Sequence, residues 1–455
     1  MQFVADLHLH SKYSRAVSQQ MILPEMARWA IKKGINILST GDWTHPLWIR
    51  EIKSLLEESG EGMYKLKSGE TNVRFLLSTE IASIYKEGDK LRRIHSLLSV
   101  PSLETAEKIS EALRTRGCNL TADGRPIIGL SCRNLLELAL EIDKRVILIP
   151  CHVWTPHFGV YGSASGFDSI TECFGDLAAY IYGIETGISS DPWMNWQIPE
   201  LNNRSILSFS DAHSLPKMAR EATVFEIDKT LETLSYVDIG RAIAYQMKKN
   251  SGKDVSDNCK IAYTIEFYPE EGKYHFAGHR LCKVSKSPEE INKEGEICPV
   301  CRKKFTEGVM YRVQQLAANS KFNPRFNRVQ NSKLDKKGVN WIEDPTNNHP
   351  PFVKLVPLNE IIAESIFSPP GSEKVKGMFD EMCLKFGSEI DVLLKVSIKD
   401  LEKSYGAKIA EGIAKVRNED IFIEPGYDGE YGKVKIWKEK EAKGAQEVSQ
   451  TGFNF

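Results

Sequence analysis

The alternation of apolar and polar positions predicts short strands separated by helices in the first half of the chain. Residues 24–33 and 102–116 have helical periodicity, and Pro24 and Gly34 stand where a helix begins and ends. Apolar, strand-like runs occupy residues 2–7, 35–39, 73–79, 145–149 and 206–209. Strands that alternate with helices predict a mostly parallel sheet or an α/β barrel.

The pattern changes after this first region. A polar linker covers residues 246–260, a compact segment rich in Cys and His follows, and residues 352–418 are predominantly helical. Residues 432–437 resemble a strand, and the residues after them are largely polar. We therefore divide the chain into a first domain at 1–250, a metal-binding module at 251–335, a helical domain at 336–437 and a tail, expected to be flexible, at 438–455.

Composition places the chain among soluble globular proteins. Of its 455 residues, 41% are hydrophobic and 27% are charged, which excludes collagen-like and disordered chains. No apolar run approaches the roughly 20 residues that span a bilayer, and the first residues contain no signal-like stretch. We therefore expect a cytoplasmic protein with no membrane contact, in which the nine cysteines stay reduced.

The net charge of −1 hides a basic segment at residues 301–340. It has ten Lys or Arg against two acidic residues, a local charge of +8. The triplet Arg302, Lys303 and Lys304 opens it, and Lys321, Arg325 and Arg328 alternate with Phe322 and Phe326. Cations that contact phosphates, interleaved with aromatic rings for unpaired bases, indicate binding to single-stranded or distorted DNA.

Imidazole and carboxylate side chains recur at the predicted strand ends. His8 and His10 end the first strand, and alternation places both on one face. Strand ends on one side of a parallel sheet or barrel meet in space. Neutral imidazoles with carboxylates suit Zn²⁺, Mn²⁺ or Fe²⁺, and several such ions together favour phosphoester hydrolysis. The other candidate ligands are Asp42 or His45, Glu80, His95, His152, Asp211 and His213.

These motifs resemble those of the PHP (polymerase and histidinol phosphatase) superfamily. The resemblance rests on Asp6-x-His8-x-His10, Thr40-Gly41-Asp42, Glu80, His95, His152 and Ser210-Asp211-Ala212-His213. It implies a distorted (β/α)7 barrel that binds two or three divalent ions, Zn²⁺, Mn²⁺ or Mg²⁺, for phosphoester hydrolysis. The same eight positions, His8, His10, Asp42, Glu80, His95, His152, Asp211 and His213, would then be catalytic metal ligands. Asp42 stands where many relatives have His, and Glu185 is a further ligand candidate.

A second metal site is indicated by His279-x2-Cys282 and Cys298-x2-Cys301. Two close pairs of such ligands complete a tetrahedral Zn²⁺ site, with two residues between the members of each pair. His275 is an alternative to His279. No position stays open for substrate, so this zinc is expected to be structural.

The order of the parts resembles the endonuclease Q family of DNA repair enzymes, which join a PHP domain, a zinc module and a helical domain. Residues 387–417, with Gly406 in a turn, resemble a helix-hairpin-helix, whose turn grips a phosphate. Further family-like stretches are residues 185–192, 219–222 and 425–429. The resemblance implies hydrolysis of the phosphodiester 5′ of uracil, hypoxanthine, xanthine or an abasic site, leaving 3′-hydroxyl and 5′-phosphate ends.

Such an activity requires contacts to a phosphate and to a base that has left the stack. Candidates near the ligand motifs are Lys12, Arg15 and Arg220 for the phosphate, and Trp43, Trp154, His157, Phe158, Trp193 and Trp196 for the base. The C-terminal Phe453 and Phe455 resemble the anchors of a sliding-clamp-binding peptide. Two alternatives stay open: a phosphatase acting on a small phosphomonoester, and a non-catalytic DNA-binding scaffold.

Overall fold

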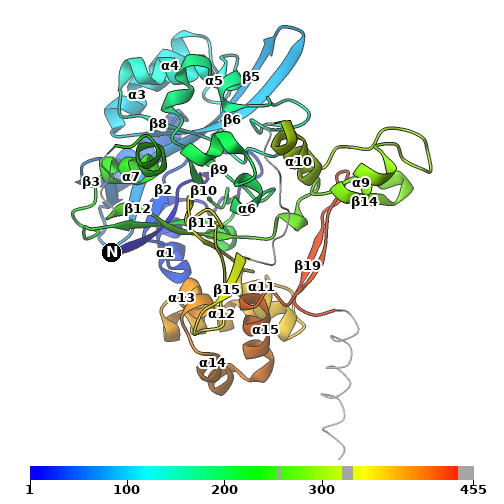
Figure 1. The fold of residues 1–455 in the computed structure, drawn as a ribbon. Helices are drawn as coiled ribbons and strands as arrows, with labels where there is room; N and C mark the ends of the chain where they lie inside the picture. The colour runs from blue at the N-terminus through cyan, green and yellow to red at the C-terminus, as the bar shows by residue number, and fades with distance from the viewer. Residues whose placement is uncertain (254–257, 320–330, 439–455) are drawn as a thin grey trace, which may run out of the picture.

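The computed structural model describes residues 1–253, 258–319 and 331–438 (Figure 1). A large α/β domain contains the N-terminus, a helical domain lies beneath it in this view, and a small module projects to one side. None of the helices in the described ranges is long and apolar enough to cross a bilayer.

One mixed sheet runs through most of the described chain. Thirteen strands belong to it, in the order β15-β16-β17-β12-β11-β1-β2-β5-β4-β3, with β6 and β7 beside β5 and β8 beside β6. These are β1 (Gln2–Asp6), β2 (Ile37–Ser39), β3 (Leu56–Gly60), β4 (Met63–Leu66), β5 (Arg74–Glu87), β6 (Lys90–Val100), β7 (Ile127–Ile128), β8 (Ile147–Pro150), β11 (Ala222–Ile227), β12 (Cys259–Glu266), β15 (Ser332–Leu334), β16 (Asn340–Ile342) and β17 (Phe352–Lys354).

The sheet is mixed rather than mostly parallel. Strands β1, β2 and β5 are parallel, as expected for strands joined by helices. However, β5 turns directly back into β6 as a long hairpin, and β1 pairs antiparallel with β11. The short parallel pair β9 (Gly183–Glu185) and β10 (Ser205–Leu207) lies between β8 and β1, linked by isolated contacts such as the bridge from Leu9 to Ala212. The predicted α/β class is confirmed.

Helices cover this sheet. Two match their sequence signals: Gly34 ends α1 in a left-handed conformation, and Ser102 caps α3 by accepting from the amide of Thr105. The helices of this domain are α1 (Leu23–Lys33), α2 (Pro46–Leu55), α3 (Leu103–Thr115), α4 (Cys132–Ile142), α5 (Ile170–Phe174), η1 (Gly175–Tyr180), α6 (Pro192–Asn195), η2 (Pro199–Asn203), η3 (Leu215–Lys217), α7 (Tyr236–Ile243) and α8 (Tyr245–Asn250).

The projecting module and the helical domain come from the second half of the chain. The module contains η4 (Pro269–Glu271), β13 (Ala277–His279), η5 (Arg280–Cys282), β14 (Val284–Lys286), α9 (Pro288–Glu294) and α10 (Val309–Asn319). The helical domain contains α11 (Leu358–Ser365), α12 (Glu373–Phe386), α13 (Glu389–Leu394), α14 (Ile398–Tyr405) and α15 (Ala407–Arg417). The hairpin β18 (Phe422–Glu424) and β19 (Lys433–Lys435) runs from this domain toward the module (Figure 1).

The sheet does not stop at the sequence boundaries that we drew. β12 lies beyond residue 250, and β17 lies beyond residue 335, yet both pair within the sheet of the first domain. Trp29 stacks on Phe379 and Lys33 pairs with Glu389, which joins α1 to the helical domain. The domain division stays a prediction.

Candidate metal centre

The His-x-His motif follows β1 directly, and both rings are fully buried. The Nδ1 atom of His8 lies 2.9 Å from Glu185, and the Nδ1 atom of His10 lies 3.1 Å from Asp42. Each carboxylate fixes the orientation of one ring, which turns both Nε2 atoms toward the same space. Strand alternation therefore delivers two ligand atoms to one point, as expected.

Three buried polar atoms meet at that point without a hydrogen-bond partner: Nε2 of His8, Nε2 of His10 and Oδ1 of Asp211. Oδ1 of Asp211 lies 3.0 Å from the His10 atom and 3.7 Å from the His8 atom. Oε2 of Glu80 lies 3.2 Å from Nε2 of His10. Unsatisfied buried atoms of this kind are costly unless something binds them, and this donor set fits a divalent metal ion.

Glu80 also belongs to a second ligand group, with His95 and His152. Its Oε1 atom lies 2.5 Å from Nδ1 of His95 and 3.2 Å from Nε2 of His152. One carboxylate therefore faces two groups of imidazoles, one through each oxygen. A carboxylate in this position can bridge two ions and offset their repulsion.

The charges in this cluster are strongly coupled. Burial opposes ionisation of Glu80, but His95, His8 and the other imidazoles around it lower its pKa well below the usual value. Burial would likewise lower the pKa of His8, but Glu185 and the neighbouring acids raise it well above the usual value. The buried carboxylates thus require compensating positive charge, which divalent ions would supply in place of protons.

Asp42 and Glu185 lie behind the histidines rather than among the converging atoms. Oδ2 of Asp42 accepts bonds from the amide and hydroxyl of Ser11 and from the hydroxyl of Ser14, while Oδ1 faces His10. Glu185 contacts His8 and accepts a bond from the amide of His152. These oxygens are engaged in hydrogen bonds, so both carboxylates orient the ligand rings. The role of Asp42 as a ligand in place of histidine stays a prediction, and Glu185, grouped with His8 and Cys151, stays a candidate ligand.

Two other predicted ligands lie at the edge of the cluster. The ring of His213 is 4.9 Å from that of His10, and its Nδ1 atom lies 2.8 Å from the backbone oxygen of Asp211. His213 is partly exposed on the open side of the site. His45 instead stacks on Tyr13, with ring centroids 4.4 Å apart, and burial lowers its pKa.

The backbone at the site is constrained. Asp42, His152 and Asp211 have positive φ angles of 47°, 29° and 48°, a region that side-chain-bearing residues seldom occupy. Gly124 leaves room that the site needs, since a Cβ atom there would lie 2.4 Å from Oδ2 of Asp42.

Arg125, beside this glycine, is a site residue that the sequence interpretation missed. Its guanidinium lies 3.1 Å from Oε2 of Glu80 and is 25% exposed, so a cation borders the cluster on its open side. Burial would lower its pKa, but Glu80 and Asp211 raise it. Asp123-Gly124-Arg125 follows no predicted strand, and only the fold brings this loop to the cluster.

The three predicted phosphate-binding cations lie in different surroundings. Lys12 pairs with Glu51 at 2.9 Å, and Arg15 is 82% exposed near Asp123. Arg220 pairs with Glu271 and stacks on Phe267, with its side chain 9% exposed. Glu271 and Phe267 cover most of the Arg220 side chain, and its contact with the substrate phosphate stays a prediction.

The aromatic candidates divide in the same way. Trp43 and Trp154 are fully buried in the core, which corrects the expectation that they line a base pocket. Trp193 and Trp196 border a cavity of about 710 Å³ with Asn202 and Asn348, on another part of the surface. Phe158 remains beside the cluster: its ring lies 4.3 Å from that of His95. His157 precedes it and is exposed.

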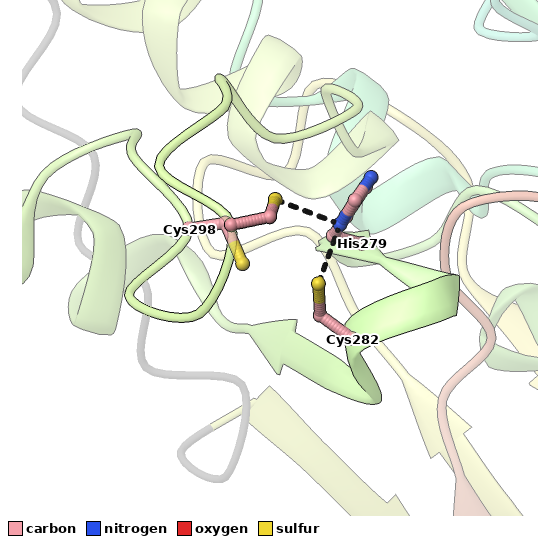
Figure 2. A group of neighbouring side chains, drawn as sticks. His279, Cys282 and Cys298 are labelled. Atoms are coloured by element: carbon pink, nitrogen blue, oxygen red, sulfur yellow. Dashed lines mark hydrogen bonds between the residues drawn. The ribbon is translucent and has the colours of Figure 1, made fainter.

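The Cys3His group, in the projecting module, has the predicted members His279, Cys282, Cys298 and Cys301. Nδ1 of His279 lies 3.0 Å from the sulfur of Cys282 and 3.3 Å from that of Cys301. Figure 2 shows His279 and Cys282 pointing toward each other, with Cys298 on the facing loop. Their ligand atoms lie within 4.8 Å of one another, an arrangement that fits one tetrahedral ion. The alternative ligand, His275, is outside this group.

The basic triplet lies on the surface beside this group. Arg302, Lys303 and Lys304 are exposed, and Lys304 pairs with Glu296 at 2.7 Å. Other predicted contacts lie outside the described residues: Lys321, Phe322, Arg325, Phe326 and Arg328, and the tail residues Phe453 and Phe455.

Fold and ligand groups together define an α/β protein with a candidate metal-binding cluster at its strand ends and an appended Cys3His module. Two solved structures match it along nearly its whole length. One is the lesion-specific endonuclease PfuEndoQ from Pyrococcus furiosus, with a TM-score of 0.76, 28% identity, and coverage of 98% of this chain and 99% of that one. The other is endonuclease Q in complex with a 27-mer duplex carrying an abasic lesion, with a TM-score of 0.76, 29% identity, and coverage of 96% and 98%.

The resemblance to endonuclease Q is thus confirmed. Residues 357–420 match the family described as the MJ0043 C-terminal domain. The uncharacterized protein MJ0043 of Methanocaldococcus jannaschii is 30% identical over 318 residues, which are 69% of this chain and 35% of that protein. The chain therefore spans about a third of the length of this relative.

Proposed function

We propose that this protein is a metal-dependent DNA repair endonuclease. It hydrolyses the phosphodiester 5′ of a deaminated base (uracil, hypoxanthine or xanthine) or of an abasic site, leaving 3′-hydroxyl and 5′-phosphate ends. The observation that carries the proposal is the strand-end cluster, in which His8, His10 and Asp211 aim possible ligand atoms at one point beside Glu80. The likeness to a lesion-specific endonuclease supports DNA as the substrate.

Two ligand sets would hold the active-site ions, Zn²⁺, Mn²⁺ or Mg²⁺. One contains His8, His10, Glu80 and Asp211, and the other contains Glu80, His95 and His152. When bound, such ions would activate water for attack at neutral pH and would stabilise the charge on the phosphate. His213, on the open side, is the remaining candidate ligand.

The other residues of the site position the substrate and the ligands. Asp42 and Glu185 hold the histidine rings, so the ligand atoms are oriented before substrate arrives. Arg125 donates to Glu80 with part of its guanidinium, and the remainder can bind a non-bridging oxygen of the scissile phosphate. Phe158 offers an aromatic face to a base that has left the stack.

The Cys3His module and the tail would make further contacts. A structural Zn²⁺ held by His279, Cys282, Cys298 and Cys301 orders the module, whose exposed Arg302, Lys303 and Lys304 contact the DNA backbone. For the tail we propose that Phe453 and Phe455 bind a sliding clamp.

The test is incubation of the full chain with end-labelled duplexes that contain uracil, hypoxanthine, xanthine, an abasic site or normal bases. Each duplex is tested with Mn²⁺, Mg²⁺ or Zn²⁺, and a chromogenic phosphomonoester is tested in parallel. We expect a single nick 5′ of the lesion whose 3′ end a polymerase extends. Hydrolysis of the phosphomonoester alone, or DNA binding with no nick under any metal, contradicts the proposal.

A further inference from the structure

The two turns of the Cys3His group carry apolar side chains at their tips. Leu281, between His279 and Cys282, is 84% exposed, and Val300, between Cys298 and Cys301, is 65% exposed. Single exposed apolar residues are ordinary. Here, however, both turns of one small module direct a branched apolar side chain into solvent, while its own buried cluster consists of Ala277, Ile291, Cys298 and Phe305.

Each tip has the same chemical surroundings. Exposed Arg280 and Lys283 flank Leu281, and exposed Arg302 and Lys303 follow the turn of Val300. A surface that alternates apolar side chains with cations is complementary to a ligand with an apolar interior and an anionic margin. Duplex DNA has this chemistry, because its stacked bases lie between two rows of phosphates.

The tips are also tied together. His279 contacts both Cys282 of the first turn and Cys301 of the second, at 3.0 and 3.3 Å, so one ligand group joins the two turns. The amide of Arg280 donates to Asp428 at 2.6 Å, which anchors the first turn to the segment between β18 and β19. A turn that is anchored in this way can keep its conformation when its apolar side chain contacts stacked bases.

We propose that Leu281 and Val300 form a wedge that enters the base stack beside the lesion and holds the lesion nucleotide outside the duplex. Apolar side chains that insert between bases unstack them, and the neighbouring cations keep the phosphates in register. This proposal rests on the proposed function and assigns the module a role beyond backbone contact.

The experiment compares nicking of an abasic-site duplex with nicking of the same lesion in a single strand. In the double variant Leu281→Ser/Val300→Ser we expect duplex nicking to fall by roughly tenfold or more, because unstacking loses its apolar partner. Single-strand nicking should change by less than about twofold, since no stacked partner must be opened. The matched control is Leu384→Ser, an 89% exposed leucine on α12, which should leave both rates unchanged.

Three further measurements separate the possible causes. 2-Aminopurine next to the lesion should brighten when the wild type binds and stay dim with the double variant, and this readout needs no cleavage. The wild type and the Leu281→Ser/Val300→Ser variant should bind the same amount of zinc per chain. The variant Leu281→Phe/Val300→Ile, which keeps both side chains apolar, should nick duplex at the wild-type rate.

Equal duplex nicking by wild type and double variant overturns the wedge. The wedge is also overturned if the double variant retains zinc but loses nicking equally on the duplex and the single strand. A third contradicting result is a double variant that nicks duplex normally but no longer binds the anionic vesicles that the wild type binds. If the wild type nicks neither substrate, the proposed function is wrong. The change in 2-aminopurine fluorescence on DNA binding then tests the wedge by itself.

Discussion

The two ligand groups of this protein are built in opposite ways. The Cys3His group draws its members from residues 279–301, on two turns of one small module. The strand-end group draws on residues from His8 to Asp211, which the large sheet brings together. The first is local in sequence, whereas the second exists only when most of the first domain has folded.

The surroundings differ as much as the spacing. Around the strand-end group, the histidine rings are oriented by hydrogen bonds that Asp42 and Glu185 accept, and a large apolar core lies behind them. Around the Cys3His group, four buried side chains form the cluster that packs the module. An ion at the strand-end group can therefore act in catalysis, because the protein itself orients the ligands. An ion in the Cys3His group is needed for folding, because little else holds its ligands in place.

Loss of one cysteine ligand should give the largest effect. In Cys298→Ser we expect the module to lose its ordered structure, because structural zinc sites contribute about 10–16 kcal/mol to the folding of such units. Hydrogen exchange of residues 277–317 measures the loss, and the α/β domain should keep its protection. The control is Cys118→Ser, a half-buried thiol outside the ligand groups. If the hydrogen exchange of Cys298→Ser equals that of the wild type, the Cys3His group is not needed for the fold of the module.

A change in the strand-end group should remove activity and leave the fold intact. In Asp211→Asn we expect nicking to fall by about 10³-fold or more, since a lost charge at the ions raises the barrier by several kcal/mol. DNA affinity and melting temperature should stay close to those of the wild type. If Asp211→Asn nicks at the wild-type rate, the catalytic ions are bound elsewhere. If Asp211→Asn unfolds, the strand-end group stabilises the fold, as we expect of the Cys3His group.

The sequence was most informative where possible ligand residues recur at the ends of predicted strands. His8 and His10 alternate at the end of a strand, and Asp211 follows another, so their meeting could be expected from topology alone. The four members of the Cys3His group could be picked out from the sequence because their spacing is local, and the structure brings them together. The α/β class followed from the alternation of strands and helices, but the antiparallel return of β6 did not. The second half of β6 is buried on both faces, so it lacks the alternation that would mark an antiparallel strand.

What the sequence could not predict depends on close packing. Trp43 and Trp154 stand near ligand motifs in the chain, yet both side chains point into the core. Arg220 has the charge for a phosphate but is covered by Phe267 and Glu271. Arg125 carries no motif, and its place beside Glu80 depends on the close approach of Gly124 to Asp42.

Arg125 tests whether the open side of the strand-end group binds phosphate. For Arg125→Ala we expect kcat/KM to fall by about 10²-fold, the usual effect of losing one charged donor to a developing oxyanion. Active-site metal content should not change, because Arg125 is outside both ligand groups. Arg125→Lys should recover part of the rate.

The control for Arg125 is Arg133→Ala, which removes a surface guanidinium paired with Asp176 and Glu137. This variant should retain the wild-type rate. A parallel loss of metal and activity in Arg125→Ala would instead mean that the arginine supports Glu80 rather than substrate.

The smallest expected effect concerns Glu266, a fully buried carboxyl at the end of β12. The hydroxyls of Ser208 and Thr264 donate to it, and Thr186 lies 3.4 Å away. Burial raises its pKa to about 8, so the folded chain retains a proton that the unfolded chain releases above its ordinary value of 4.5. Stability therefore falls as the pH rises from about 4.5 toward 8.

Glu266→Gln removes this titration. The melting temperature of the variant relative to the wild type should rise by roughly a few degrees between pH 5 and pH 8.5, because each unit of pKa shift corresponds to about 1.4 kcal/mol. Glu373→Gln, at a 91% exposed position, should show no such trend. A constant difference across this pH range would mean that Glu266 is ionised in the folded protein.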